Sequence, residues 1–399
     1  MWENKIDIKH VTEIRTKTTT FFGVGAINKI SDIAEALSQM KINKAIVVTG
    51  KGSHIKTGAW DVVKEAFDKK GIGYKLYSEV TPNPNVDQVD EATKIALEFG
   101  AQAVVAIGGG SPIDTGKSVA ILMAYPDKNA RDLYGFTFTP AKAVPIITIN
   151  LTHGTGTEVN RFAVVSIPEN EYKPAIAYDC IYPIFSIDDP ALMTKLPVEQ
   201  TLYVSVDAIN HVVEASTSKA ANAFSILLAK EVVRLVVKYL PIAKENPEDL
   251  TARYYLLYAS MIAGTSFDNG LLHFTHALEH PLSGVKPELS HGLGLSMLLP
   301  AVVKQIYPAS GEVLADVLSP IIPGLKGTAD EAEKAFEGVK SWLKNTGIKS
   351  QLTDEGFTKG DVDKLVKLAF ETPSLGLLLS MAPVEATEET VRQIYENSL

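Results

Sequence analysis

Short apolar segments alternate with helical segments along the first half of the chain, and this order constrains the fold most. Four apolar segments have the length and composition of buried strands: 44–49, 72–80, 101–110 and 143–150. Helical stretches separate them: 58–71, 86–99 and 111–125. Strands joined by helices of this length form βαβ units, which predict a parallel sheet. A hairpin is expected over 161–179 and one more strand over 183–188.

The second half of the chain has a different pattern, because only helical periodicity is present after Pro197. The main helical segments are 198–218, 221–240, 250–267, 329–347 and 358–373. We therefore predict an α/β domain with a parallel, Rossmann-like sheet over residues 1–195 and an all-α domain over 196–399. A cleft between two such domains is the usual place for a site.

Charge and composition exclude several kinds of partner. The net charge is −9 and no Lys/Arg-rich run occurs, which argues against nucleic acid or an anionic membrane surface. The first residues, "MWENKIDIKH", lack the apolar core of a secretory signal, and no apolar run reaches the ~20 residues of a membrane span. Cys180 is the single cysteine, so an internal disulfide and a cysteine-rich metal site are excluded. We expect a cytoplasmic protein.

Three consecutive glycines follow the third predicted strand, in "AVVAIGGGSPIDTGKS". Gly108, Gly109 and Gly110 stand where a parallel strand turns into a helix, so backbone N–H groups can approach an anion closely. Ser111 is expected to cap this helix and Pro112 to lie in its first turn. A tight turn that binds nothing is the alternative, but it does not need three glycines. The loop therefore predicts phosphate binding.

A second polar loop, "INLTHGTGTEVNRF", follows the fourth predicted strand. Thr152 and Thr155 carry hydroxyl groups there, and Thr155 stands between Gly154 and Gly156. Loops at the carboxyl ends of neighbouring parallel strands flank one crevice. These hydroxyls are therefore expected to contact a ribose, a phosphate or a nicotinamide amide.

The stretch from Leu271 to Gly292 holds four of the eight histidines of the chain. His273, His276 and His280 have spacings that place them on one helix face, and Pro281 is expected to end that helix. The fourth, His291, follows a loop.

A carboxylate and an imidazole occur at i and i+4 in "VSVDAINHVVEA", namely Asp207 and His211. Their apolar surroundings predict that they face inward, where polar groups need partners such as a metal ion. Together with two histidines of the 271–292 stretch they would give one oxygen and three nitrogen ligands, a set that suits Fe(II) or Zn(II). Spacing alone leaves three pairs open: His276/His291, His280/His291 and His273/His276.

Taken in order, the motifs resemble those of the iron-containing alcohol dehydrogenases, and most closely their NADP-dependent thermophile branch. They cover nearly the whole chain: "FFGVGAI", "GGGSPIDTGKS", "THGTGTEV", "DAINHVVEA" and "HFTHALEHPLSG…SHGLGLSMLLP". The resemblance implies the dehydroquinate synthase-like fold and a homodimer. It also implies reversible oxidation of an alcohol to an aldehyde or ketone, with hydride transfer to NADP(H).

The resemblance assigns roles residue by residue. It implies four metal ligands for Fe(II), or Zn(II): Asp207, His211, His276 and His291. It makes His280 the active-site histidine, which would relay a proton to solvent. The cofactor pyrophosphate would lie on Gly108, Gly109, Gly110 and Ser111, and the ribose and nicotinamide near Asn83, Asp114, Thr152, Thr155 and Lys173. For His273 a packing role is expected.

Departures from the family pattern bear on the cofactor. Relatives that prefer NAD often have an acidic residue where this chain has Gly50, whereas Ser53, Lys51 and Lys56 can donate to a 2′-phosphate. We therefore expect NADP(H) in preference to NAD(H). His153 belongs to the loop "LTHGTGTE", where many relatives read "TTAGTGSE".

Three other functions fit parts of the sequence pattern. The alternatives are an NAD-dependent polyol or glycerol dehydrogenase, a metal-dependent lyase of the dehydroquinate synthase type, and a redox sensor with a structural metal. The basic residues that a carboxylated phosphate substrate needs are not apparent, and an Asp/His ligand set is open where structural sites favour Cys. A small alcohol or aldehyde is the expected substrate, in a pocket lined by helical-domain side chains such as Phe162 and Phe267.

Overall fold

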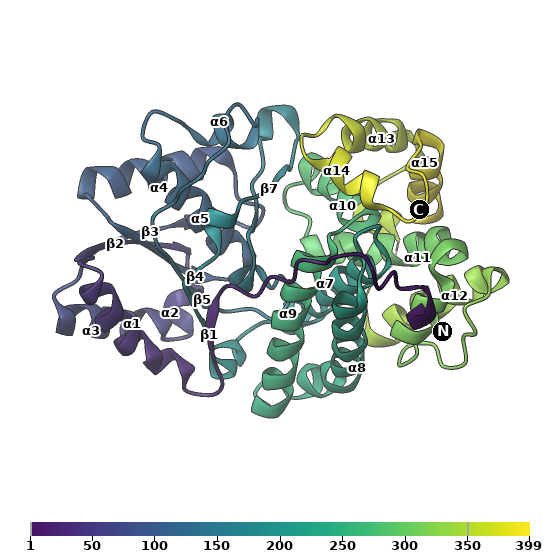
Figure 1. Cartoon of the computed structure of the whole chain (residues 1–399), viewed down its shortest axis with the longest axis horizontal. Helices are drawn as coiled ribbons and strands as arrows, with labels where there is room; N and C mark the ends of the chain where they lie inside the picture. The colour runs from purple at the N-terminus through teal and green to yellow at the C-terminus, as the bar shows by residue number, and fades with distance from the viewer. Residues whose placement is uncertain (1, 349–350) are drawn as a thin grey trace.

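The computed structural model describes residues 2–348 and 351–399, and it has two halves that lie side by side (Figure 1). A six-stranded parallel sheet in the order β1-β8-β5-β4-β2-β3 forms the N-terminal half. Helices form the C-terminal half. The predicted fold class, a parallel α/β domain followed by an all-α domain, is confirmed.

The strands follow the predicted apolar segments closely. They are β1 (Thr19–Phe22), β2 (Lys44–Gly50), β3 (Gly73–Val80), β4 (Ala103–Gly108), β5 (Ile146–Asn150) and β8 (Phe185–Asp188). Every residue of β4 and β5 is buried. Helices cover both faces of the sheet, and β4 accordingly reads as a continuous apolar run, whereas β5 also buries Thr148 and Asn150.

Neighbouring residues of a strand pack into different cores. Val47 of β2 belongs to a core with α1 (Ile30–Gln39) and α3 (Ala59–Lys70), which cover one face. Val48 belongs to a core on the other face, with α4 (Val86–Phe99), α5 (Gly110–Ala124) and α6 (Ala130–Tyr134). A short helix, α2 (Ser53–Lys56), follows β2 directly. The carboxyl ends of β2, β4 and β5 are therefore left to carry loops.

The expected hairpin is present as β6 (Phe162–Val164) and β7 (Ala175–Ala177), which pair antiparallel. Two elements before residue 44 were not predicted, β1 and α1. The edge strand β1 is only half buried, so it lacks the apolar run that marks a central strand.

The helical half is built around one large core. Its helices are α7 (Val198–Thr217), α8 (Ala223–Glu245), α9 (Leu250–Gly270), α10 (Phe274–Val285), α11 (His291–Val317), α12 (Ala332–Thr346), α13 (Val362–Glu371), α14 (Leu375–Met381) and α15 (Glu388–Asn397). The expected end of a helix at Pro281 is wrong, because α10 continues to Val285. Leu278 and Leu282 on either side are fully buried, and this packing outweighs the poor helix propensity of proline.

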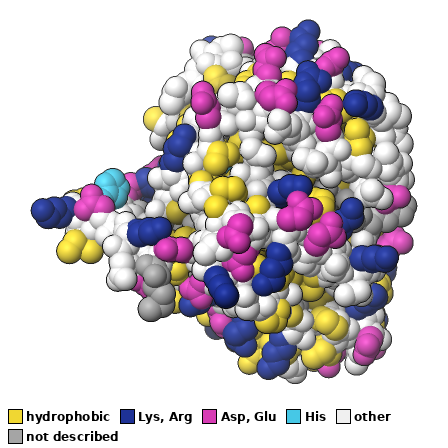
Figure 2. Space-filling view, turned by 90° about the vertical axis from the view of Figure 1, so that its right-hand side faces the viewer, with side chains coloured by type: hydrophobic (Ala, Val, Ile, Leu, Met, Phe, Trp, Pro, Cys, Tyr) yellow, Lys and Arg dark blue, Asp and Glu magenta, His cyan; other side chains and the backbone are white. Residues whose placement is uncertain are grey.

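The end of the molecule that the helical half forms is polar. On the face shown in Figure 2, basic and acidic side chains are interspersed, with small groups of apolar side chains between them. Among residues 2–348 and 351–399, no helix has the length and apolar character that crossing a bilayer requires.

Candidate active site

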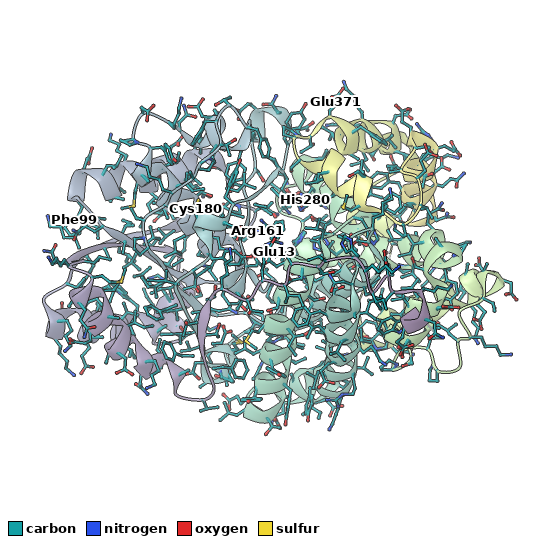
Figure 3. All side chains as sticks on the ribbon, viewed as in Figure 1. Glu13, Phe99, Arg161, Cys180, His280 and Glu371 are labelled. Carbon is teal, nitrogen blue, oxygen red and sulfur yellow. The ribbon has the colours of Figure 1, made fainter. Side chains whose placement is uncertain are left out.

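A cleft of about 800 Å³ lies between the two halves, and side chains from both line it. The sheet half contributes the loops that follow β2, β4 and β5, and the helical half contributes residues of α7, α10 and α11. Figure 3 shows His280 at this junction. Two of the residues predicted from the sequence for cofactor, metal and catalysis do not line the cleft: Gly108, at the end of β4 against Pro112, and Lys56, at the end of α2. The others all line it.

The predicted metal ligands meet on one wall of the cleft. Oδ1 of Asp207 lies 3.3 Å from Nε2 of His211 and 3.6 Å from Nε2 of His276. All three side chains are buried, yet in the part of the chain that the structure describes neither Asp207 Oδ1 nor His276 Nε2 has a hydrogen-bond partner. Buried polar atoms without partners are costly, and a divalent cation is a partner that a carboxylate and imidazoles fit.

Three of the four predicted ligands cluster tightly. One ligand atom from each of Asp207, His276 and His291 lies within 4.8 Å of the others. His211 stands beside this group, with its ring stacked 4.6 Å from that of His276 and 4.4 Å from that of Phe267. Of the histidine pairs that spacing left open, His276/His291 is the one that the described residues bring together with Asp207.

Glu214, which holds the ring of the predicted ligand His276, was not predicted from the sequence. Its carboxylate accepts a hydrogen bond from Nδ1 of His276 and bonds from the backbone N–H groups of His273 and His276, at 2.9 and 3.3 Å. A carboxylate that holds one ring nitrogen turns the other toward a metal. The signal was present: Glu214 stands seven residues after Asp207 and three after His211, so all three share one face of α7.

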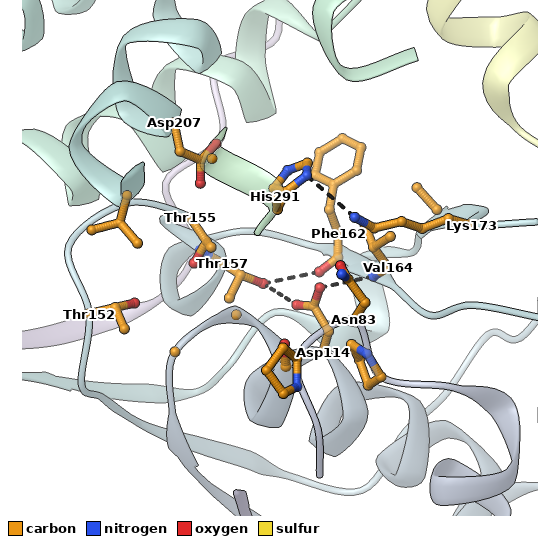
Figure 4. Close-up of a pocket in the computed structure, with 18 of the residues that line it drawn as sticks. Asn83, Asp114, Thr152, Thr155, Thr157, Phe162, Val164, Lys173, Asp207 and His291 are labelled. Atoms are coloured by element: carbon orange, nitrogen blue, oxygen red, sulfur yellow. Dashed lines mark hydrogen bonds between the residues drawn. The ribbon is translucent and has the colours of Figure 1, made fainter. Parts of the chain in front are cut away.

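Glu279 was missed as well, and it is the counterpart of Glu214 at His291. Its Oε2 accepts from Nδ1 of His291 and from Nζ of Lys173, the latter at 3.2 Å. Ligand atoms of Glu279, His280 and His291 form a second close group. Lys173 was expected at the ribose; its ammonium group instead lies 3.3 Å from Nδ1 of His291, on the helical wall of the cleft (Figure 4).

Mutual attraction sets the charges in this wall. Burial alone would lower the pKa of His276, but the carboxylates of Glu214 and Asp207 outweigh it and raise this pKa to about 9. Burial alone would raise the pKa of Asp207 and of Glu214, yet their histidine neighbours lower each to about 2. Both carboxylates are thus ionised at neutral pH and His276 is protonated, so a cation that binds its Nε2 has to displace that proton. Burial, aided by the charge of Lys173, lowers the pKa of His280 well below its usual range.

The glycine loop after β4 packs closely against the loop after β5. A Cβ on Gly109 would lie 2.7 Å from the side chain of Thr152, and one on Gly110 would lie 2.8 Å from that of Thr155. Both positions therefore require glycine. The helix α5 begins at Gly110 with Gly109 as its N-cap, so the expectation that Ser111 caps it is wrong. The helix therefore begins two residues earlier than predicted, which leaves Ser111 in its first turn, where it lines the cleft.

Asp114 and Asn83 are held by bonds within the protein. The carboxylate of Asp114 accepts from the Thr157 hydroxyl at 2.7 Å and from the Val164 backbone N–H at 2.9 Å (Figure 4). The amide of Asn83 donates to the carbonyl groups of Pro287 and Leu289 at 2.8 and 3.1 Å. Asn83 thereby ties the sheet half to the loop that leads into His291.

The loop after β2 lies at the far end of the cleft. Gly50, Lys51, Gly52 and Ser53 all line it, and none is acidic. A Cβ on Gly50 would lie 3.2 Å from the carbonyl oxygen of Val80, so a side chain there requires a small shift.

The sequence also led to expectations for His273, Phe162 and Phe267. His273 caps α10, since its Nδ1 accepts from the Phe274 N–H at 2.7 Å, and its Nε2 lies 3.0 Å from the Thr217 hydroxyl. This fits the expected packing role. Phe162 and Phe267 do line the cleft, but Phe162 belongs to β6 of the sheet half, so its expected place in the helical domain is wrong.

Comparisons with known proteins agree over the whole chain. The family model for iron-containing alcohol dehydrogenase matches residues 17–190, and that for the C-terminal part of the Fe-containing alcohol dehydrogenase family matches residues 201–399. The long-chain primary alcohol dehydrogenase AdhA of Thermoanaerobacter ethanolicus is 62% identical over 398 residues, covering 100% of both chains. The NAD-dependent methanol dehydrogenase of Bacillus methanolicus is 31% identical, over 93% of this chain and 96% of its own.

Solved structures give the same result. The NADH-dependent butanol dehydrogenase A of Thermotoga maritima superposes with a TM-score of 0.90 at 30% identity, and the match covers 97% of this chain and 98% of that one. A 1,3-propanediol oxidoreductase superposes with a TM-score of 0.87 at 29% identity, over 98% of this chain and 100% of the other.

Proposed function

This chain belongs to the iron-containing alcohol dehydrogenase family, and from that premise we propose that it interconverts primary alcohols and aldehydes with NADP(H) and a divalent metal ion. Residues 1–195 would bind the dinucleotide and residues 196–399 the metal. One observation carries the proposal. Oδ1 of Asp207 and Nε2 of His276 are buried at the wall of the cleft, and neither has a hydrogen-bond partner among the described residues.

The metal would be Fe(II), and Zn(II) fits the same ligands. The proposed ligands are Asp207, His211, His276 and His291. A divalent ion there would supply Lewis acidity at the substrate oxygen, and a bound nicotinamide would exchange the hydride. The protein's own part is to orient the imidazoles through Glu214 and Glu279. It also brings the proposed metal ligands and the proposed cofactor loops together in one cleft.

We assign the proton relay to His280. Its ring is buried at the cleft, 5.9 Å from that of His291 between centroids, and its Nδ1 has no hydrogen-bond partner among the residues described. A lowered pKa keeps the ring neutral at pH 7, so that Nδ1 can accept a proton as the alcohol is oxidised.

NADP(H) is proposed from the loop after β2. An acidic side chain at Gly50 would repel a 2′-phosphate, whereas Lys51 and Ser53 line the cleft and can donate to one. Relatives named for NAD or NADH occur in the family, so cofactor preference varies within it and depends on such local charges. An NAD-dependent polyol dehydrogenase is the competing proposal.

The substrate is proposed to be a primary alcohol with an apolar chain, the class named for the relative at 62% identity. The helical half lines the cleft with apolar side chains near the metal wall: Phe267, Leu271, Leu272, Leu377, Leu378 and Met381. Phe267 stacks on His211, so the apolar surface begins directly beside the proposed metal.

A homodimer is also proposed. The strand β1 is at one edge of the sheet, where unpaired backbone groups are open to another strand. Ile8 and Val11, in the segment before it, are 91% and 93% exposed, and such apolar side chains favour burial against a second copy. Light scattering of the purified protein tests this, and a monomer contradicts it.

The test of the function is the rate of aldehyde reduction under anaerobic conditions, with butanal as the probe. NADPH and NADH are compared on protein stripped of metal by a chelator and on protein reloaded with Fe(II). Activity that disappears on stripping, returns with Fe(II) and is higher with NADPH is the expected result. Higher activity with NADH contradicts the cofactor proposal alone, and no turnover with either cofactor contradicts the dehydrogenase.

A further inference from the structure

Glu279 has surroundings that differ from those of an ordinary buried carboxylate. It lies on α10 and is fully buried. Its Oε2 faces Nδ1 of His291 and, at 3.2 Å, Nζ of Lys173, while its Oε1 accepts from the Ser283 hydroxyl. Both carboxylate oxygens are therefore used, and one of them touches a proposed metal ligand.

Space for this carboxylate is provided by α11. A Cβ on Gly294 would lie 2.8 Å from Cγ and 3.0 Å from Oε1 of Glu279, so the glycine lets the glutamate lie against the helix. Gly294 is three residues after His291, on the same side of α11. The absence of a side chain at that point is what allows Glu279 to reach the imidazole.

The group of Glu279, His280 and His291 could itself be taken for a second metal site. A positive charge already occupies it, however. The ammonium group of Lys173 lies 3.2 Å from Glu279 and 3.3 Å from His291 Nδ1, and the lysine is 5% exposed. A divalent cation there would meet like charge at close range. Among the residues that the structure describes, no lysine or arginine is bonded to Asp207, so the two groups have different roles.

The Glu279–His291 pair repeats the Glu214–His276 pair in outline. In both, a buried glutamate accepts from Nδ1 of an imidazole that belongs to the Asp207 group. They differ in charge, because Lys173 offsets the carboxylate of Glu279. Lys173 also comes from the segment between β6 and β7, so this buried ion pair crosses from the sheet half to the helical half.

We infer that Glu279, held by Lys173, is a positioning residue that fixes Nδ1 of His291 and so directs its Nε2 to the ion shared with Asp207 and His276. The inference rests on the proposed function, since it requires a metal in the Asp207 group. A metal-ligating histidine whose second nitrogen loses its partner typically binds metal 10- to 100-fold more weakly.

The test is Co(II) binding to the full-length, metal-free protein. A titration measures the affinity, and the visible absorption spectrum of the bound ion reports its ligand field. The variants are Glu279→Ala, which removes the bonds to His291, Lys173 and Ser283, and Glu279→Gln, which keeps the volume and one acceptor oxygen. Asp268→Asn is the matched control. Asp268 is also a buried carboxylate that joins the halves, through Arg161 and Tyr182, but it contacts none of the proposed ligands.

We expect Glu279→Ala to weaken Co(II) binding about 10- to 100-fold and to change the absorption spectrum, with a smaller loss for Glu279→Gln. Asp268→Asn should bind Co(II) as the unmodified protein does. If Glu279→Ala does not fold, as judged by circular dichroism, Glu279→Gln decides. Binding within about twofold and an unchanged spectrum in the folded variants, or an equal loss in Asp268→Asn, overturns the inference. Failure of the unmodified protein to bind Co(II) would instead count against the proposed function.

Discussion

Gly156, in the loop after β5, and Gly264, in α9, are in contact backbone to backbone across the two halves of the molecule. A Cβ on Gly264 would lie 2.3 Å from the carbonyl oxygen of Gly156. Main-chain atoms cannot rotate away, so Gly264→Ala must push α9 from the loop. We expect a loss of about 1–3 kcal/mol in the free energy of unfolding, measured by urea denaturation. Weaker NADPH binding should accompany it, because the loop carries Thr155.

A second helical glycine provides the control for this substitution. A Cβ on Gly376 of α14 would have no heavy atom within 4 Å among the residues that the structure describes. Gly376→Ala should therefore be neutral or stabilise the protein by up to about 1 kcal/mol. Equal effects of the two substitutions would show that the contact with Gly156 is not what constrains Gly264.

The metal site predicts a change in thermal stability. Because the ligands converge only in the folded chain, Fe(II) or Zn(II) should stabilise it by about 2.7 kcal/mol at a free concentration of 100 Kd. Asp207→Asn should remove most of this rise in Tm, since Asp207 is the one carboxylate in the proposed set. The measurement is a thermal melt with and without metal. An unchanged metal-dependent rise in Asp207→Asn would place the ion elsewhere.

Most elements that bury both faces or one helical stripe were predicted from the sequence. β4 and α4 are examples, since continuous apolar residues mark the strand and periodic ones the helix. The helix α1 was missed, although it buries such a stripe: Ile30, Ile33, Ala34 and Leu37. β1 was not predictable in this way, because it pairs with β8, which is far away in the sequence. Thr19, for example, pairs with Phe185, 166 positions further along the chain. The prediction that a helix ends at Pro281 failed for a related reason. The local propensity of proline favours the end of a helix, but packing in the core stabilises α10 beyond it.

At the site, the sequence indicated residue types with strong chemistry and missed those that orient them. Asp207 and His276 stood out as a carboxylate and an imidazole in apolar surroundings. Glu214 and Glu279 did not, because a glutamate in a helix is ordinarily a solvated residue, and only tertiary structure shows that both are fully buried. The choice among histidine pairs likewise needed the fold, since spacing cannot relate α7 to α10 and α11.

Cofactor preference should respond to one charge. Gly50→Asp is expected to lower kcat/KM for NADPH about 10- to 100-fold relative to NADH, because a carboxylate repels the 2′-phosphate and can accept from a 2′-hydroxyl. Gly50→Ala is the matched control, as it adds the same Cβ, 3.2 Å from the Val80 carbonyl, without charge. Steady-state rates with both cofactors give the ratio. A similar ratio in both variants would mean that crowding, and not charge, determines the preference.

Acid should destabilise the protein through His153, which is buried away from the cleft. Its Nε2 accepts from Arg253 at 2.9 Å, and burial together with that cation lowers its pKa from 6.5 to about 3. His153 therefore becomes protonated near pH 6.5 in the unfolded chain, but only near pH 3 in the folded chain. Between these values each unit of falling pH should cost about 1.4 kcal/mol of the free energy of unfolding. From pH 6.5 to 5.0 this histidine should contribute a loss of roughly 2 kcal/mol.

His153→Gln tests this assignment, since the amide keeps an acceptor for Arg253 but cannot titrate. Urea denaturation at pH 6.5 and 5.0 should show that the variant loses roughly 2 kcal/mol less than the unmodified protein over this interval. It should still lose some stability, because His211 and His273 are also buried and burial lowers the pKa of each to about 4. His10→Gln, at an exposed position, controls for the loss of a histidine as such. An unchanged pH dependence in His153→Gln would mean that His153 is already protonated in the fold, in which case its ring could not accept the hydrogen bond from Arg253.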